Sequence, residues 1–390
     1  MKGLIIFCHP AVNYLVSTDV ISQYLFFKRA KKTFNSNNIE ILYYYDLLEE
    51  TNKFKYENIE ENYKYSESDL ITEYKKDCIE IRNKIINNYT NYILIGLEPI
   101  GFDQITNYNL PNKKILSIYD PHGFYLIQNR KNTDTDKIRT IFDKEHIFND
   151  ARLDEVNLIV SPSVLYFKNI NSNYFNKCKF VSFSYNEENN KLFSIQNFES
   201  FFNRKMLIVL QGANQNCYKY RNSLFFIKNK LNESVNFINN FINFDNRDKF
   251  CELLEILPCS RYNRSNSKYN DEPGIKYLET LSQYQGSFIF FAVFPINFIL
   301  AKVFEVMLAG CIAFIEPNES LKNDLGLIEY EHYVPVLMTN NKMVFDTNYY
   351  NKYLGTQEGL RIAKNGFNYI KNNFTDNKIA LNYIKILSNL

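Results

Sequence analysis

Two short polar turns carry side chains that could act as acids or bases. Cys8-His9-Pro10 ends an apolar run that begins at Gly3, and Asp120-Pro121-His122-Gly123 follows the apolar run Lys113 to Tyr119. Histidine or aspartate can deprotonate a hydroxyl group, so we expect the catalytic base to be Asp120 or His122, with His9 as a further candidate. Proline, glycine and aspartate also favour turns for conformational reasons alone, so both segments also fit turns without chemistry.

Two other segments could bind phosphate groups. The first is Gln211-Gly212-Ala213-Asn214 with the basic residues that follow it, and the second is the basic run Arg261 to Lys268. Backbone N–H groups at a helix N-terminus and basic side chains are the protein groups that hold a diphosphate. The residues that we expect to do so are Gly212, Arg221, Arg261 and Arg264. The basic run also fits a solvated loop, and its interleaved tyrosines would suit single-stranded nucleic acid.

Asp134-Thr135-Asp136 is a D-x-D motif, a pattern that holds a divalent ion when it ends an apolar strand. Here the polar residues Q-N-R-K-N-T precede it and a helix-like segment follows, so we favour the first turn of a helix. The sequence has no H-E-x-x-H, no G-x-S-x-G and no P-loop, which excludes the commonest hydrolases and NTPases. We expect neither a tightly bound metal nor a cofactor.

Apolar runs alternate with helix-like segments along the whole chain and indicate the elements that position these residues. The expected strands include Gly3 to Cys8, Ile39 to Tyr45, Tyr92 to Leu97, Lys113 to Tyr119, Val156 to Ser161, Phe180 to Phe183, Met206 to Leu210, Ser287 to Val293, Cys311 to Glu316 and Tyr333 to Met338. Continuous apolar runs of this kind are typical of parallel strands that are buried on both faces. The alternation predicts parallel α/β architecture in two tandem domains.

Expected helices flank these strands. They include Asp248 to Leu257, Ala301 to Leu308, Thr356 to Asn373 and Asp376 to Leu387. We place the first domain at residues 1–195 and the second at residues 196–375. Residues 376–390 are expected to form a C-terminal helix that packs back toward the first domain.

Composition excludes several classes of protein. The 45 lysines and arginines against 43 aspartates and glutamates leave a formal charge of +2, so no global field attracts nucleic acid. The 7 scattered cysteines follow no metal or disulfide pattern, which favours a reducing compartment. The N-terminal apolar run is too short for a secretion signal, and no segment is long enough to span a membrane. We therefore expect a cytoplasmic protein.

One continuous segment resembles a known family. It reads Y-L-E-T-L-S-Q-Y-Q-G-S-F-I-F-F from Tyr277, then A-K-V-F-E-V-M-L-A-G-C-I-A-F-I-E-P, then E-H-Y-V-P-V up to Val336. This resembles the nucleotide-sugar-binding domain of GT-B glycosyltransferases, particularly the CgeB-like group-1 set. The run His332 to Val336 also looks like the CAP10-like protein O-glucosyltransferases.

The resemblance implies a fold, an activity and residue roles. The fold would be α/β, with two Rossmann-like domains that face a cleft, the first binding the acceptor and the second the donor. Glu305, in F-E-V-M-L-A-G, would bind the two ribose hydroxyls, for which a carboxylate is a good bidentate acceptor. Lys302 and His332 would contact the same donor. The family's retaining members carry another glutamate at the position of Asn297. Because this sequence has asparagine there, it argues against a retaining mechanism.

We therefore expect a glycosyltransferase that moves a hexosyl or pentosyl group from a nucleoside-diphosphate sugar to an unidentified hydroxyl. Its acceptor could be a glycan, a protein or a small molecule. A non-catalytic nucleotide- or sugar-binding protein is the alternative, and Asn297 supports it. Glu305 on a solvent-facing helix surface, and His332 with a purely structural role, also remain open.

Overall fold

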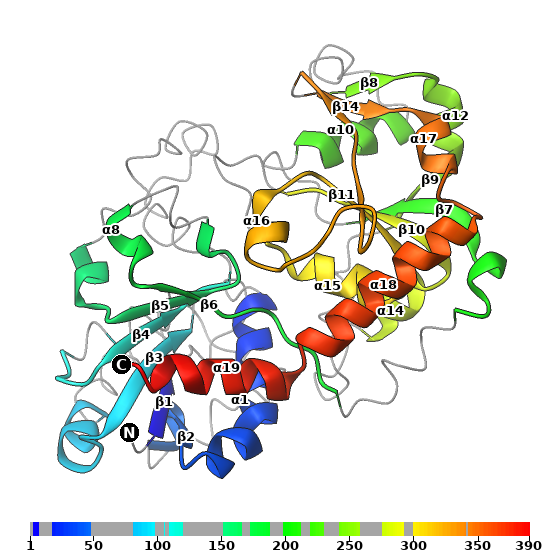
Figure 1. Ribbon diagram of the computed structural model, residues 1–390. Helices are drawn as coiled ribbons and strands as arrows, with labels where there is room; N and C mark the ends of the chain where they lie inside the picture. The colour runs from blue at the N-terminus through cyan, green and yellow to red at the C-terminus, as the bar shows by residue number, and fades with distance from the viewer. Residues whose placement is uncertain are drawn as a thin grey trace, which may run out of the picture. The chain divides into compact units, whose positions relative to one another are not determined.

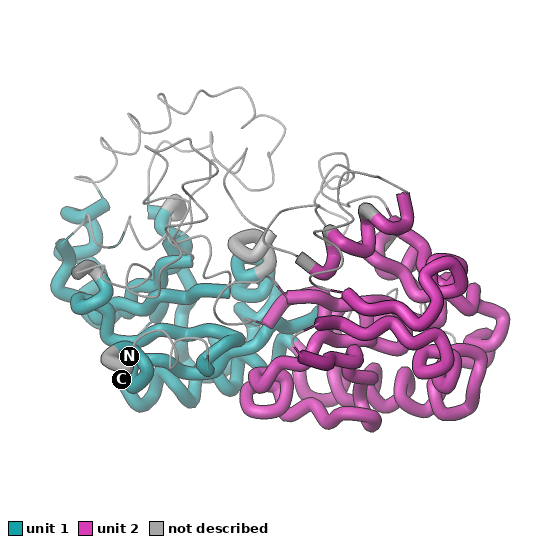
Figure 2. Tube along the Cα trace, turned by 90° about the horizontal axis from the view of Figure 1, so that it is seen from above, with its two compact units in different colours: residues 1–186, 376–390 teal, residues 187–375 magenta. Residues whose placement is uncertain are grey.

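The computed structural model describes residues 3–7, 18–47, 81–97, 105, 109–119, 151–165, 172–187, 198–211, 219–229, 242–257, 275–291, 299–340 and 342–390. The chain divides into two compact units (Figure 2). Unit 1 comprises Met1–Asn186 with Asp376–Leu390, and unit 2 comprises Glu187–Thr375.

Unit 1 is built on a six-stranded sheet in the order β2-β1-β3-β4-β5-β6 (Figure 1). Its elements are β1 (Gly3–Phe7), α1 (Thr18–Ser36), β2 (Glu40–Tyr43), η1 (Tyr44–Leu47), β3 (Tyr92–Leu97), β4 (Lys114–Ser117), η3 (Ala151–Glu155), β5 (Leu158–Ser161), α8 (Ser172–Phe175), β6 (Cys178–Phe180) and α19 (Asp376–Leu387). Every neighbouring pair of strands is parallel. β1, β3, β4 and β5 are buried along their whole length, which explains why their sequences are predominantly apolar.

The C-terminal helix α19 packs against α1 of unit 1. The Asp376 carboxylate accepts hydrogen bonds from Arg29 Nε at 2.6 Å and from Ser184 Oγ at 2.5 Å. The ring of Tyr383 meets that of Phe27 at a centroid distance of 5.4 Å. A charged anchor and an aromatic contact together hold the end of the chain on the first sheet.

Unit 2 is built on a five-stranded parallel sheet in the order β12-β11-β10-β7-β9, and a three-stranded sheet β13-β14-β8 lies in the same unit. Its elements are η4 (Phe201–Asn203), β7 (Lys205–Leu210), α10 (Lys219–Lys228), β8 (Ile242–Phe244), α12 (Arg247–Leu253), β9 (Leu254–Ile256), α14 (Ile275–Leu281), β10 (Tyr284–Ile289), α15 (Ala301–Leu308), β11 (Ile312–Ile315), α16 (Glu319–Asn323), β12 (Val334–Pro335), β13 (Met338–Thr339), β14 (Lys342–Phe345), α17 (Thr347–Asn351) and α18 (Gln357–Asn373).

An aromatic cluster forms the core on one side of the five-stranded sheet. Its members include Phe250, Phe288, Phe314, Phe345 and Tyr350. The closest rings belong to Phe250 and Phe345, with centroids 4.1 Å apart. Helix α12 brings Phe250 to this core, and the central strands β10 and β11 contribute Phe288 and Phe314. β14 and α17 add Phe345 and Tyr350 from the C-terminal part of the unit. Distant segments of the sequence are thus joined in one core.

The prediction of two α/β units with parallel sheets is confirmed. The expected strand Phe180 to Phe183 is misplaced, because β6 spans Cys178–Phe180 and ends where the expected strand begins. Two further local predictions are wrong. The expected helix Asp248 to Leu257 ends at Leu253, because Leu254–Ile256 forms β9 and pairs with β7. The expected strand Tyr333 to Met338 is interrupted, and only Val334–Pro335 pairs with β11. Both errors arise because strand pairing depends on residues far apart in the sequence, which the local pattern of apolar residues does not predict.

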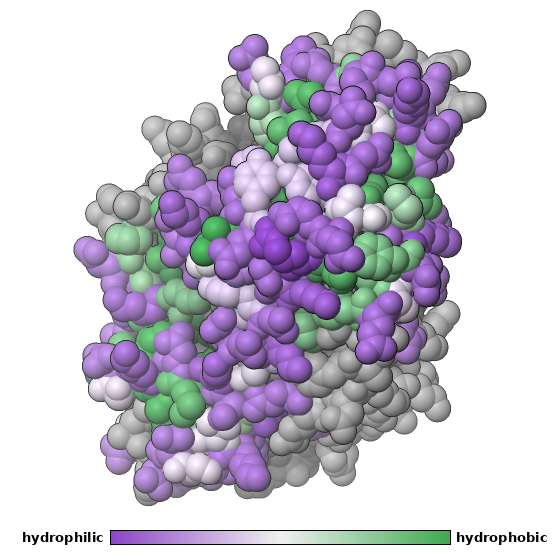
Figure 3. All heavy atoms as spheres, turned by 45° about the vertical axis from the view of Figure 1, so that its right-hand side comes forward, coloured by the Kyte–Doolittle hydropathy of each residue, from purple (hydrophilic) through white to green (hydrophobic). Residues whose placement is uncertain are grey.

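Among the described residues, no helix is both long and apolar enough to cross a membrane. The face drawn in Figure 3 is mostly hydrophilic, and its hydrophobic residues lie in small patches. The isolated exposed side chains of this kind, such as Met206 and Ile328, are normal on a folded surface.

Candidate functional site

Helix α15 carries the two charged side chains that the sequence singles out. Lys302 and Glu305 lie one helical turn apart and therefore share a face, whereas Val303, Val306 and Met307 are buried against the core. The helix connects β10 to β11, which are parallel neighbours, so its N-terminus lies at the carboxyl end of the sheet. Open α/β sheets bind their ligands at this end.

Lys302 links this helix to the neighbouring strand β7. Its Nζ donates a hydrogen bond to the backbone oxygen of Gln211 at 2.6 Å, and Gln211 directly follows β7. Leu300, the N-cap residue of α15, makes no side-chain capping bond. The first turn of α15 and the end of β7 therefore form one corner of the candidate site, with an ammonium group and helix N–H groups close together.

Arg221 and Tyr220 lie in the first turn of α10 and are both buried. Arg221 Nη2 donates to the backbone oxygen of Phe290 at 3.3 Å, just beyond the end of β10. The ring centroids of Tyr220 and Phe290 are 6.2 Å apart. These contacts attach the start of α10 to the carboxyl end of the sheet.

Glu316, a buried acidic residue directly after β11, was not singled out by sequence reasoning. Its Oε2 accepts a hydrogen bond from the backbone N–H of Phe291 at 2.9 Å. Burial, followed by the charge of Glu316, raises the pKa of Tyr220 to about 12, so the tyrosine stays neutral. The signal in the sequence was an acidic residue at the end of the apolar strand I-A-F-I.

His332 precedes β12 and is largely buried. Its Nδ1 accepts a hydrogen bond from the backbone N–H of Ile328 at 3.0 Å, and its ring lies 4.4 Å from that of Tyr369. Burial lowers the pKa of His332, and the nearby carboxylate of Glu331 opposes this only in part. The ring is therefore neutral near pH 7, with its proton on Nε2, and one of its nitrogens is used within the fold.

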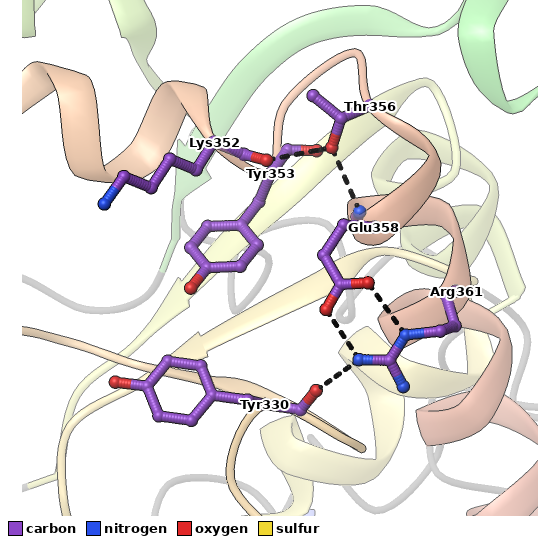
Figure 4. A network of polar contacts seen from close by, with 7 residues as sticks. Tyr330, Lys352, Tyr353, Thr356, Glu358 and Arg361 are labelled. Carbon is purple, nitrogen blue, oxygen red and sulfur yellow. Dashed lines mark hydrogen bonds and ion pairs between the residues drawn. The ribbon is translucent and has the colours of Figure 1, made fainter.

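Helix α18 holds the chain segment around His332 in place. Arg361 Nη2 donates to the backbone oxygen of Tyr330 at 2.7 Å and forms an ion pair with Glu358 (Figure 4). Gly366 allows the helix to approach His332 closely, because a Cβ atom there would lie 2.5 Å from the His332 backbone oxygen. Backbone contacts thus fix this segment from one side.

Arg204 closes the opposite end of α15. Its Nη1 donates to the backbone oxygens of Ala309 at 3.2 Å and Gly310 at 2.8 Å. The guanidinium group also lies 5.6 Å from the ring centroid of Phe201, and burial lowers its pKa. A cation at the C-terminus of a helix interacts favourably with the helix dipole. Arg204 therefore stabilises the helix that carries Lys302 and Glu305.

The remaining residues predicted for the site lie outside the described residues. They are His9, Asp120, His122, Gly212, Arg261 and Arg264, and the positions of Asn297 and of the D-x-D motif are outside them as well. Their roles stay predictions. Among the described residues, no group of three or more histidine, cysteine, aspartate or glutamate side chains could hold a metal ion.

No protein-family model matches this sequence, and no curated protein matches it either. Solved structures do resemble it. HepE of Anabaena, determined in complex with UDP and glucose, is similar with a TM-score of 0.53 and 9% identity over 100% of both chains. Sucrose-phosphate synthase of Thermosynechococcus elongatus has a TM-score of 0.51 and 8% identity, over 99% of this chain and 98% of that one.

The trehalose-6-phosphate synthase OtsA is similar to the same degree, with a TM-score of 0.51 and 10% identity over 100% of this chain and 99% of that one. At such low identity these similarities show the fold alone. The fold is that of the GT-B glycosyltransferases, with two Rossmann-like α/β domains. The predicted fold class is therefore confirmed.

Proposed function

We propose that the protein is a glycosyltransferase that transfers a hexosyl or pentosyl group from a nucleoside-diphosphate sugar to a hydroxyl group of an unidentified acceptor. The observation that carries this proposal is the pair Lys302 and Glu305, on one face of a helix that begins at the carboxyl end of the unit 2 sheet. The GT-B fold supports the class, and the resemblance of Tyr277 to Val336 supports a CgeB-like or CAP10-like subtype. The similar structure of HepE was determined with UDP and glucose, which fits the same donor chemistry.

The donor's parts match the charges on this face. A carboxylate accepts hydrogen bonds from both ribose hydroxyls, so we assign this contact to Glu305. The diphosphate needs positive charge and N–H groups, which the first turn of α15 with Lys302 supplies. Arg221, in the first turn of α10, adds a second basic group at the same end of the sheet. Gly212, Arg261, Arg264 and His332 are proposed as further donor contacts.

The reaction is proposed as a single displacement. A base from Asp120 or His122, or His9, takes the proton of the acceptor hydroxyl while its oxygen attacks the anomeric carbon. The bond from that carbon to the diphosphate oxygen breaks, and the nucleoside diphosphate departs with the bonding electrons. Basic side chains and helix N–H groups stabilise the charge on the leaving group, so the proposal includes no bound metal and no cofactor.

The test combines binding and turnover. Thermal unfolding is followed with UDP-glucose, GDP-mannose and ADP-glucose, because a ligand that binds the folded state raises its stability. The variant Glu305→Gln should bind the stabilising donor about 10- to 100-fold more weakly, since one charged hydrogen-bonding group is lost. Glu279→Gln, at an exposed position on α14, is the matched control and should bind normally. Equal donor affinity in Glu305→Gln and the wild type would refute the ribose assignment.

The alternative function is a nucleotide- or sugar-binding protein without catalysis. Asn297, at the position where retaining relatives carry a glutamate, is the observation that favours it. Hydrolysis or transfer of a radiolabelled donor sugar separates the two, since the alternative predicts binding without turnover. We further propose that the protein works in the cytoplasm and does not bind nucleic acid. A chelator should leave turnover unchanged, and a salt-dependent shift with RNA or DNA would contradict the nucleic-acid proposal.

A further inference from the structure

The side chain of Gln211 has an unusual environment at the end of β7. The residue is only 6% exposed, and its Oε1 is buried without a hydrogen-bond partner among the described residues. Its backbone oxygen, by contrast, accepts the bond from Lys302 Nζ. A buried acceptor without a donor costs folding free energy, and native proteins keep few of them. This unpaired oxygen lies at the carboxyl end of the sheet, where α/β proteins bind ligands, so a ligand could supply the missing hydrogen bond.

The strand register locates this oxygen relative to the proposed donor contacts. Val209 pairs with Ser287, so Gln211 lies beside Ile289 at the end of β10 and points to the same face of the sheet as Val209. Helix α15 reaches the same end of β7, because Lys302 Nζ donates to the backbone oxygen of Gln211. The carboxamide and the Lys302–Glu305 face therefore belong to the same corner of unit 2.

We propose that the Gln211 carboxamide accepts a hydrogen bond from a hydroxyl group of the sugar nucleotide, and this inference rests on the function proposed above. The orphaned atom is an acceptor, so its partner must carry a hydrogen. The diphosphate oxygens are ionised and carry none at neutral pH, which excludes them. Hydroxyl groups occur on the ribose and on the transferred sugar, and both provide the same donor chemistry.

Gln211 would then contribute to recognition in a way that basic residues do not. A site that is built to pair with a hydroxyl discriminates against analogues that lack it, because the protein group is then left buried and unpaired. Lys302 and the helix N-terminus attract any diphosphate by charge. Gln211 would instead recognise a neutral hydroxyl group of the ligand. The site would then distinguish sugar nucleotides from other phosphate compounds.

The experiment compares two glutamines of the same sheet. Gln211→Met removes the orphaned oxygen and keeps a side chain of similar length. Gln285→Met is the matched control: Gln285, fully buried in β10, accepts from Gly355 N at 2.6 Å and donates to the Phe201 backbone oxygen at 3.2 Å. Without ligand, the control should lower the thermal midpoint by at least about 4 °C, because two bonded backbone groups lose their partner. Gln211→Met should leave the midpoint unchanged or raise it.

Calorimetry then measures the affinities of the wild type and both variants for UDP and UDP-glucose, GDP and GDP-mannose, and ADP and ADP-glucose. Gln211→Met should weaken binding about two- to tenfold, the effect of one neutral hydrogen bond, while Gln285→Met should leave it unchanged. Equal weakening of a nucleotide and its sugar conjugate assigns the bond to the nucleoside part, and the same weakening for all the nucleotides that bind assigns it to the ribose, which they share. Weakening of the conjugate alone assigns it to the sugar.

Three results would overturn the inference. Unchanged affinity of Gln211→Met for a pair that the wild type binds would mean that no ligand hydroxyl uses this oxygen. A thermal midpoint lowered as much as in Gln285→Met would mean that the oxygen has a partner within the protein. Failure of the wild type to bind any of the three pairs would remove the proposed function itself, and is distinguished from the other two results by the wild-type measurement.

Discussion

Two neighbouring tyrosines of α17 should respond in opposite directions to the same substitution. Tyr349 donates its hydroxyl hydrogen to the backbone oxygen of Pro335 at 2.7 Å. Tyr350 is completely buried, and its hydroxyl group has no hydrogen-bond partner among the described residues. Burial raises the pKa of both residues, so both hydroxyls stay protonated over the whole working pH range. Phenylalanine removes only the hydroxyl group and keeps the ring contacts.

The expected magnitudes follow from these bonding states. Tyr349→Phe loses a buried hydrogen bond and leaves the Pro335 oxygen unpaired, which should cost about 1 to 2 kcal/mol of unfolding free energy. Tyr350→Phe removes a buried hydroxyl group that gains nothing from the fold, so it should stabilise the protein by up to about 1 kcal/mol. The loss in packing volume is small and common to both substitutions.

Urea unfolding of both variants, monitored by circular dichroism, measures these differences directly. The midpoint of Tyr349→Phe should fall below the wild type and that of Tyr350→Phe should equal or exceed it. In thermal unfolding each kcal/mol corresponds to about 2 to 4 °C in a unit of this size. Destabilisation of similar size in both variants would refute the reasoning, because the Tyr350 hydroxyl group would then have a stabilising partner.

Two more predictions concern the segment around His332. Alanine normally stabilises a helix interior relative to glycine, but Gly366→Ala should destabilise unit 2 by more than about 1 kcal/mol in urea unfolding, because its Cβ would collide with the His332 backbone oxygen. The pKa of His332 is lowered in the folded state, so the unfolded chain binds more protons just below pH 6.5 or so. Stability from this group should be complete above about pH 6.5 and decline as the pH falls below it toward the lowered pKa of the folded state. His332→Gln should reduce this slope in a pH series of unfolding curves. A steeper slope in the variant would contradict the neutral state of the buried ring.

The strands of both units were predictable where they are buried on both faces. β1, β11 and the second half of β7 correspond to short apolar runs, since water is excluded from both sides of them. β9 was not predictable, because its three residues follow a helix without a break and become a strand only by pairing with β7. Pro335 ends β12 at the edge of its sheet, where a missing N–H group is tolerated.

Part of the candidate site followed from the sequence as well. The spacing of Lys302 and Glu305 places them on one helix face whatever the rest of the chain does. The contact of Lys302 with Gln211, and the bond from Phe291 to Glu316, depend instead on the strand order β11-β10-β7. Helical spacing is local information, whereas strand order is decided by the packing of the whole unit, and therefore these partners could not be assigned beforehand.

The charged residues at the carboxyl end of the unit 2 sheet also bond to backbone groups, and this affects how their roles can be tested. Lys302 binds the carbonyl group of Gln211, and Arg221 binds that of Phe290. Glu316 accepts a hydrogen bond from the backbone N–H of Phe291. Each side chain thereby fixes the loop that follows a neighbouring strand. Loss of donor binding on replacing Arg221 would therefore fit a displaced loop as well as a lost phosphate contact. Gln211 is more informative, because its side-chain oxygen bonds to no other group among the described residues. Removal of this oxygen should therefore change the affinity for the donor without changing the stability of the fold.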